Sequence, residues 1–132
     1  MRIVVLIARL LMGLAFLVLG LNGFLHFIPT GSPPPGLAGT YYGVLIASNY
    51  YILTFGVQVV AGILLLANQY VRLALVLLGA ELVNILTFHI TMMPSGLPLA
   101  LIMTVLWLIV AYDHRAFFSE VFARTSSRAD SV

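Results

Sequence analysis

The sequence predicts an all-α protein: a four-helix transmembrane bundle with both termini on the cytoplasmic side. Three observations predict this fold class. Hydrophobic residues make up 62% of the 132 residues and charged residues only 8%, whereas soluble domains average about 45–50% and about 25%. Four apolar segments approach the roughly 20 residues that a helix needs to cross a bilayer. All six basic residues fall on one side of a four-span arrangement.

Four segments are predicted to span the membrane: residues 3–27, 51–67, 71–92 and 97–112. The proline-rich stretch 29–36 ends the first helix, because proline lacks the N–H donor and clashes with the preceding turn. A polar turn at residues 68–70 and a Pro/Gly turn at residues 94–98 separate the later helices. These two short connections make consecutive helices antiparallel neighbours.

The first apolar run begins just after Arg2, as it does in a secretory signal peptide. However, the run extends to about residue 27, beyond the roughly 7–15 residues of a signal-peptide apolar region. No Ala-x-Ala cleavage pattern follows it. We therefore expect a helix that is retained in the mature protein.

Two shorter segments are predicted to lie at the membrane surfaces. Residues 37–49 are uncharged and too short to span, and they favour a short interfacial helix between helices one and two, with an ordered loop as the alternative. Residues 113–124 group their aromatic side chains on one face. They favour a juxtamembrane amphipathic helix, or a continuation of helix four into water. The prediction is one domain over residues 1–125 and a flexible cytoplasmic tail over 126–132.

The orientation follows from the positions of the arginines. In the four-span arrangement they share one side: Arg2, Arg9, Arg72, Arg115, Arg124 and Arg128. The first and third connections contain neither Arg nor Lys. Since short loops rich in Arg and Lys stay in the cytoplasm, this side is predicted to be cytoplasmic. Three or five spans would divide the set, so the pattern independently favours four.

Composition also excludes several kinds of function. The chain has no cysteine, which excludes disulfides, thiolate metal sites and Cys-ligated clusters. The net charge of +2 is too small and too scattered for a nucleic-acid surface. The sequence has no phosphate-binding loop, catalytic triad spacing or metal-ligand cluster. We therefore expect no catalysis by this chain alone, and at most a role as the accessory subunit of an oxidoreductase.

Two charged residues fall within the predicted spans. Arg9 lies about two turns into helix one, and Glu81 about ten residues into helix three. At about 1.5 Å per residue their depths differ by a few Å, so we predict a buried ion pair that joins the two helices. A substrate or proton site is the functional alternative. In a third possibility Arg9 extends to the headgroups and Glu81 is protonated.

Five neutral polar side chains are predicted to surround a cavity in the outer half of the bundle: Asn22, His26, Gln58, Asn84 and His89. Such a cavity would suit a quinone or another small polar ligand. Ordinary hydrogen bonds between helices are the simpler interpretation. The direction of His89 stays open, because five residues place it about 140° around the helix from Asn84. Haem ligation by the two histidines is chemically possible but has no further signature.

Small residues recur within the spans, and we expect them to permit close helix packing rather than to form a site. They are Gly13, Gly20, Gly56, Gly62 and Gly79.

The sequence resembles the DoxX-like family of bacterial four-helix integral membrane proteins. The resemblance covers residues 8–122 and rests on ordered pieces: ARLLMG at 8–13, LGLNGF at 19–24, ASNY at 47–50, VQVVAG at 57–62, VNILTFH at 83–89 and PSGLP at 94–98. The family often has Glu where this chain has Gln58, and an uncharged residue where it has Glu81. One interpretation is that the buried acid has moved from helix two to helix three.

The resemblance implies a membrane subunit of a redox or quinone-linked system in a bacterial inner membrane. The family is named after a subunit associated with a thiosulfate–quinone oxidoreductase and terminal oxidase system. Quinone, redox proteins and further copies of the chain are the partners it implies, besides the lipid bilayer. Two alternatives stay open: a small transporter, and a membrane scaffold protein that binds no ligand.

Overall fold

The computed structural model of the protein describes residues 2–28 and 33–125. In these ranges every regular element is a helix, in the order α1 (Arg2–Leu25), α2 (Gly36–Ala47), α3 (Tyr51–Ala67), α4 (Val71–Thr91), the 3-10 turn η1 (Pro94–Gly96), α5 (Leu97–Asp113) and α6 (Arg115–Val121). The all-helical prediction is therefore confirmed. The predicted tail at 126–132 lies outside the described residues.

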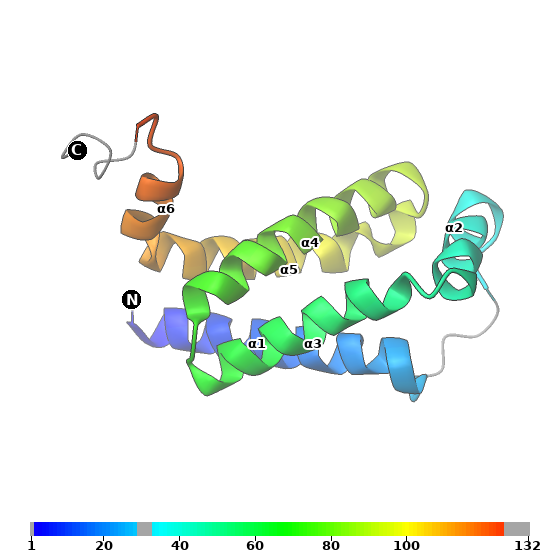
Figure 1. The fold of residues 1–132 in the computed structure, drawn as a ribbon, viewed down its shortest axis with the longest axis horizontal. Helices are drawn as coiled ribbons and strands as arrows, with labels where there is room; N and C mark the ends of the chain where they lie inside the picture. The colour runs from blue at the N-terminus through cyan, green and yellow to red at the C-terminus, as the bar shows by residue number, and fades with distance from the viewer. Residues whose placement is uncertain (1, 29–32, 126–132) are drawn as a thin grey trace.

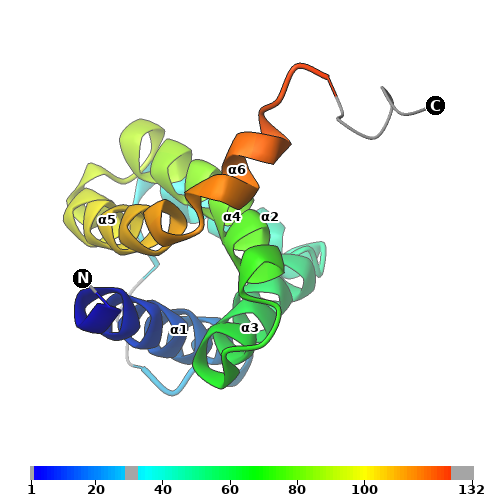
Figure 2. The same ribbon diagram turned by 90° about the vertical axis from the view of Figure 1, so that its left-hand side faces the viewer.

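The four long helices lie side by side, with α2 across one end and α6 at the other (Figure 1). Seen along their axes, they form a four-cornered arrangement (Figure 2). Helix α1 packs on α3 and α5, and α4 packs on the same two helices. Helices α1 and α4 therefore occupy opposite corners. The most extensive contact joins α1 to α3, although the whole of α2 separates them in the sequence.

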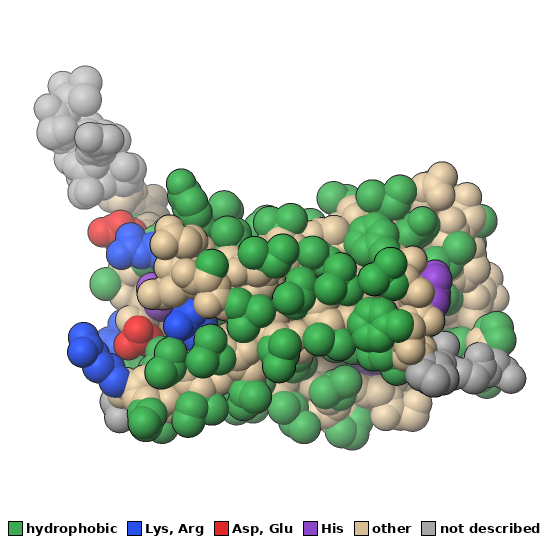
Figure 3. Space-filling view, turned by 90° about the horizontal axis from the view of Figure 1, so that it is seen from below, with side chains coloured by type: hydrophobic (Ala, Val, Ile, Leu, Met, Phe, Trp, Pro, Cys, Tyr) green, Lys and Arg blue, Asp and Glu red, His purple; other side chains and the backbone are tan. Residues whose placement is uncertain are grey.

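Three helical segments are long and apolar enough to cross a membrane: Arg2–Leu25, Val71–Thr91 and Pro94–Asp113. Helix α3 has 17 residues and qualifies only together with α2, from which it is bent by 87°. The described residues therefore contain three to four candidate spans. Their outward surfaces are covered with apolar side chains, while charged side chains gather at one end (Figure 3). Such a surface suits hydrocarbon as the solvent.

The core lies along the inner faces of the four long helices. Met12, Phe16, Leu65, Leu78 and Val110 are at most 2% exposed. These side chains, together with Ala61 and Leu75, form one buried cluster between the helices. This core positions the polar groups described below, because it fixes how each helix is rotated about its axis.

Glycines bring α1 and α3 into backbone contact. A methyl group added to Gly62 would lie 2.7 Å from the backbone nitrogen of Leu17, and one added to Gly13 would lie 3.1 Å from the Gly62 carbonyl oxygen. Gly20 is similarly enclosed by Val59. Small residues allow such an approach between membrane helices. The prediction holds for these glycines, but Gly56 faces open space, with nothing within 4 Å of an added methyl group.

The α3–α4 connection at one end of the bundle is shaped by local backbone geometry. Asn68 ends α3 in the left-handed conformation, at φ 54°. The N–H of Gln69 donates to the Leu64 carbonyl over 3.0 Å, and that of Asn68 to the Leu65 carbonyl over 3.3 Å. This is the hydrogen-bond pattern of a Schellman motif, which asparagine tolerates well. The chain then reverses into α4 within three residues.

Both predicted short helices are present. Helix α2 starts after the proline-rich stretch and packs the Tyr41 ring against Phe88, with 5.2 Å between ring centres. Helix α6 is separate from α5, since the helix breaks at His114. Helix four therefore does not run on as one unbroken helix, and the place of α6 beside the membrane stays a prediction.

Candidate functional site

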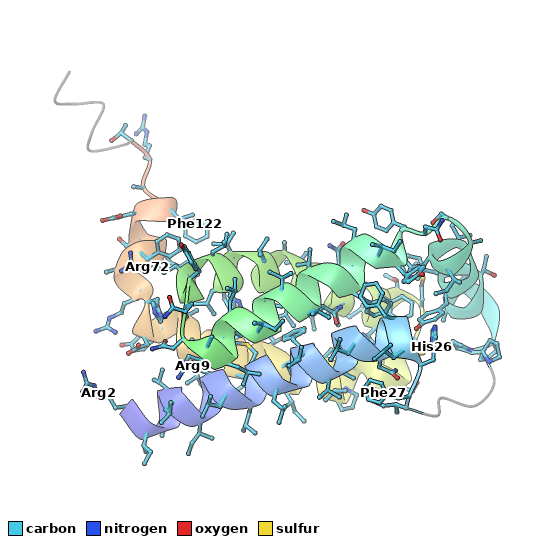
Figure 4. The ribbon with its side chains drawn as sticks, turned by 60° about the horizontal axis from the view of Figure 1, so that its bottom comes forward. Arg2, Arg9, His26, Phe27, Arg72 and Phe122 are labelled. Carbon is cyan, nitrogen blue, oxygen red and sulfur yellow. The ribbon has the colours of Figure 1, made fainter. Side chains whose placement is uncertain are left out.

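The structure does not bring the five predicted cavity residues together, and it places Asn22 and His26 at the end of α1. The side-chain oxygen of Asn22 accepts a 2.7 Å hydrogen bond from the N–H of Ile28. It therefore holds the chain where α1 ends. His26 is exposed and has a left-handed backbone, at φ 51° (Figure 4). Asn22 therefore stabilises the backbone just after α1, and His26 is exposed; neither is placed in a cavity inside the bundle.

Asn84 and His89 lie on α4 and face different surroundings. Asn84 is exposed and donates to the Ala80 carbonyl of its own helix. His89 is half-buried, and its ring packs against Gly96 where η1 meets α5. The open question about His89 is thus answered: it faces the α4–η1 corner. Only a glycine at position 96 leaves room for the ring there.

Gln58 is the buried polar side chain of the described core, at 6% exposure. Its amide nitrogen donates to a carboxylate oxygen of Glu81 over 3.5 Å, a long hydrogen bond between α3 and α4. Glu81 lies ten residues from either end of α4, close to the middle of that helix. The two residues form a polar contact deep between helices, where an amide and an acid can satisfy each other.

Arg9 and Glu81 have different partners in this structure. The Arg9 guanidinium donates to the carbonyl oxygen of Leu65 near the end of α3, whereas Glu81 accepts from Gln58. Helices α1 and α4 lie at opposite corners (Figure 2), and among the described residues each charged group is bonded to a partner other than the one predicted. The carbonyl groups at a helix C-terminus carry partial negative charge, and this satisfies a cation without a carboxylate.

An aromatic cluster at the opposite end from the arginines contains Tyr41 of α2 with Phe88 and His89 of α4. The Phe88 ring stands edge-on to His89, with 5.1 Å between centres. The Nδ1 atom of His89 lies 2.8 Å from the Ile85 carbonyl oxygen. Since a carbonyl only accepts, Nδ1 carries the hydrogen, and Nε2 of the neutral ring keeps a lone pair. This lone pair lies beside Gly96, which encloses that edge of the ring.

The arginine end of the bundle, which carries Arg2, Arg9, Arg72 and Arg115, has an open hollow of about 600 Å³. Its lining comes from the α3–α4 turn, the start of α4 and the α5–α6 junction. The lining residues are Asn68, Tyr70, Val71, Arg72, Leu73, Val76, His114 and Phe117. A second, smaller hollow of about 360 Å³ lies at the same end between Val5, Tyr112, Asp113 and Arg115.

Helix α6 forms one wall of the larger hollow because aromatic contacts hold it on the bundle. The Phe118 ring packs on Trp107 of α5, with 5.6 Å between centres. Trp107 in turn donates its indole N–H to the Leu75 carbonyl of α4 over 2.9 Å. The guanidinium carbon of Arg72 lies over the ring of the neighbouring Phe117, 5.6 Å from the ring centre. This is a cation–π distance.

The predicted orientation uses Arg72, but the hollow that Arg72 and His114 line was not predicted from the sequence. One signal was present: Arg72 begins one helix, and His114 follows the end of the next. Antiparallel neighbours place such positions at one depth. The hollow itself depends on where α6 folds, which the periodicity of residues 113–124 does not specify.

Comparisons with known proteins find no matching family model, no similar curated protein and no similar solved structure. Among residues 2–28 and 33–125, no group of three or more His, Asp or Glu side chains is placed to hold a metal ion. Over the described residues the protein is therefore helical, with three to four membrane-length helices, charged side chains gathered at one end and the Gln58–Glu81 contact near the middle of α4.

Proposed function

We propose that this chain is an integral membrane subunit that crosses the bilayer four times, with the arginine end in the cytoplasm. Helices α1, α3, α4 and α5 are the spans, and α2 lies along the opposite surface. In this proposal it belongs to a redox or quinone-linked system of a bacterial inner membrane, as the DoxX-like resemblance implies. Its role is accessory: it binds partners and ligands within the membrane.

The observation that carries the membrane proposal is the separation of charge from apolar surface. Charged side chains gather at one end, and the sides of the helices are apolar (Figure 3). Arg2, Arg9 and Arg72 all lie at that end (Figure 4). Retention of arginine-rich segments in the cytoplasm favours this orientation.

Reporter fusions test the orientation directly. Alkaline phosphatase and green fluorescent protein are fused in turn to each end of the full chain in a bacterial host. We expect fluorescence and no phosphatase activity from both ends, and phosphatase activity from a fusion within the α2 segment. Opposite reporter signals from the two ends would contradict four spans.

Within this proposal, a quinol head group is the ligand whose chemistry suits the aromatic cluster. Tyr41 and Phe88 provide apolar ring faces. Nε2 of His89 is the acceptor that a quinol hydroxyl would reach by displacing its contact with Gly96. A quinol has such a hydroxyl, whereas the carbonyls of the oxidised quinone only accept. The tautomer of His89 therefore favours the reduced form.

The quinol proposal is tested by titrating the detergent-purified protein with a short-chain ubiquinol analogue. We expect His89→Ala to weaken binding about tenfold, as loss of a buried hydrogen bond with its packing would. His26→Ala is the matched control, since His26 is exposed at the same end, and should bind as the wild type does. Equal binding by both variants would reject the histidine site.

One observation favours a scaffold over a transporter as the second candidate function. Between the Gln58–Glu81 contact and the arginine end, the interior is filled by Ala61, Leu65, Leu75 and Leu78, all fully buried. A continuous polar path through one copy of the chain would have to cross this apolar packing. A proteoliposome flux assay with ions and small solutes should accordingly give the rate of empty vesicles.

A further inference from the structure

We propose that the larger hollow at the arginine end binds one anionic phospholipid, with the phosphate beside Arg72 and an acyl chain along α4. This inference rests on the proposed membrane insertion, because it assigns the occupant to the surrounding bilayer. The hollow of about 600 Å³ is within the usual size of small-molecule sites.

The polar half of the hollow suits a phosphate group. Arg72 lines the hollow, and a cation–π contact with Phe117 orients its guanidinium group. Guanidinium pairs with phosphate through parallel N–H donors. The side chains of Asn68 and Tyr70 line the same hollow and can donate to further oxygens. The first turn of α4, which no side chain caps, adds the positive end of a helix dipole.

The apolar half continues from the hollow along the outside of α4. Leu73 and Val76 line the hollow and are 50% and 45% exposed. Ala80 and Val83 follow at helical spacing on the same face and are exposed as well. This stripe of about ten residues is about 15 Å long, half the thickness of the hydrocarbon core. An acyl chain of one leaflet has about this length. A phosphate beside Arg72 would therefore place the acyl chain along the apolar stripe of α4.

Charge and position distinguish a lipid from an acidic protein segment as the occupant. A peptide held by Arg72 would leave the exposed apolar stripe of α4 uncovered, whereas an acyl chain would cover it. Basic pockets beside transmembrane helices on the cytoplasmic side are the usual sites for anionic lipid headgroups. The adjacent anionic leaflet keeps the local concentration of such lipids high.

The first experiment measures headgroup selectivity by native mass spectrometry of the full chain released from detergent. The protein is titrated with dioleoyl phosphatidylglycerol and, separately, with dioleoyl phosphatidylcholine. We expect a clear preference for phosphatidylglycerol. Arg72→Gln should reduce its binding about fivefold, the effect of one arginine near a charged surface. Arg2→Gln, an exposed arginine at the same end but outside the hollow, should leave it unchanged.

A second pair of variants tests the acyl-chain surface. Leu73→Ser should weaken phosphatidylglycerol binding severalfold, because an apolar contact is lost. Leu101→Ser is the matched control, since Leu101 lies on α5 and is also 50% exposed. Equal loss in both variants would show that lipid contacts are unspecific and would overturn the proposal.

Competition separates a lipid site from a simple phosphate site. Millimolar inorganic phosphate should not displace phosphatidylglycerol, because phosphate lacks the acyl chain. Displacement by phosphate, unchanged binding in Arg72→Gln, or equal affinity for the two lipids would each overturn the lipid site. Reporter fusions check the topology of each variant, and circular dichroism checks that each variant is folded. If the topology result holds while lipid selectivity is absent, the lipid site alone is rejected.

Discussion

The α1–α3 seam and the α4–α5 seam lie on opposite sides of the four-helix arrangement and are packed by different side chains. Along the first, glycines at 13, 20 and 62 bring two backbones into contact. Along the second, the only tryptophan of the chain lies over Gly79 and donates to the Leu75 carbonyl over 2.9 Å. Lipid tails are as apolar as the helix surfaces, so the hydrophobic effect does not drive helices together within a membrane. Close packing and hydrogen bonds therefore stabilise both seams.

The two seams differ in how far they tolerate a larger side chain. Where the α1 and α3 backbones touch, any added side-chain atom causes a clash, so this seam suits a rigid support for the bundle. The aromatic seam extends through Trp107 and Phe118 to α6, and α6 supplies a wall of the larger hollow. A change at this seam should therefore reach the proposed lipid site, while a change at the glycine seam should affect the whole bundle.

The largest expected effect is at Gly62. Gly62→Ala places a methyl group 2.7 Å from the Leu17 nitrogen, and we expect a loss of about 1–3 kcal/mol of unfolding free energy from overpacking. Gly56→Ala is the control: its methyl group meets nothing within 4 Å, and alanine favours the helix by up to about 1 kcal/mol. Reversible denaturation in mixed micelles measures both. Equal losses in the two variants would mean that α1 and α3 do not meet here.

Replacement of the tryptophan tests the second seam. Trp107→Phe keeps an aromatic ring but removes the hydrogen bond to Leu75, and we expect a loss of about 1 kcal/mol. The variant should also loosen α6. Limited proteolysis after Arg115 and Arg124 should then be faster than in the wild type. Phe122→Leu is the control, because Phe122 is exposed just after α6. This variant should be cleaved at the wild-type rate.

A smaller effect is expected at the polar contact between the two seams. A double-mutant cycle with Gln58→Leu and Glu81→Leu should give a coupling of about 0.6 kcal/mol, the average for hydrogen bonds between membrane helices. A coupling of zero would show that the 3.5 Å contact contributes nothing to the α3–α4 packing.

The smallest effect is expected between Arg9 and Glu81. The cycle of Arg9→Met with Glu81→Leu should show a coupling below about 0.5 kcal/mol, as for residues with no shared partner. Arg9 bonds instead to the Leu65 carbonyl. A coupling of several kcal/mol would restore the ion pair that the sequence predicts.

Much of the fold follows from local sequence. Asn68 ends α3 by backbone geometry, and the helix boundaries were predicted to within a few residues. The site was predicted less well. Asn22 and His26 were expected in a cavity, but the chain needs Asn22 to bond the backbone just beyond α1. Periodicity gives the face of a residue on its own helix, and it does not give the neighbour that this face meets.

The sequence by itself determined that the chain is helical, that its surface is apolar, and that Arg2, Arg9, Arg72 and Arg115 share one end. These properties follow from composition, from proline and glycine punctuation and from short connections, all of which act locally. Only the tertiary structure decided that α1 and α4 lie at opposite corners, that Gln58 rather than Arg9 meets Glu81, and that Arg72 and Phe117 flank a hollow. Helix rotation and pairing depend on how side chains far apart in sequence fit together, and no local pattern encodes that fit.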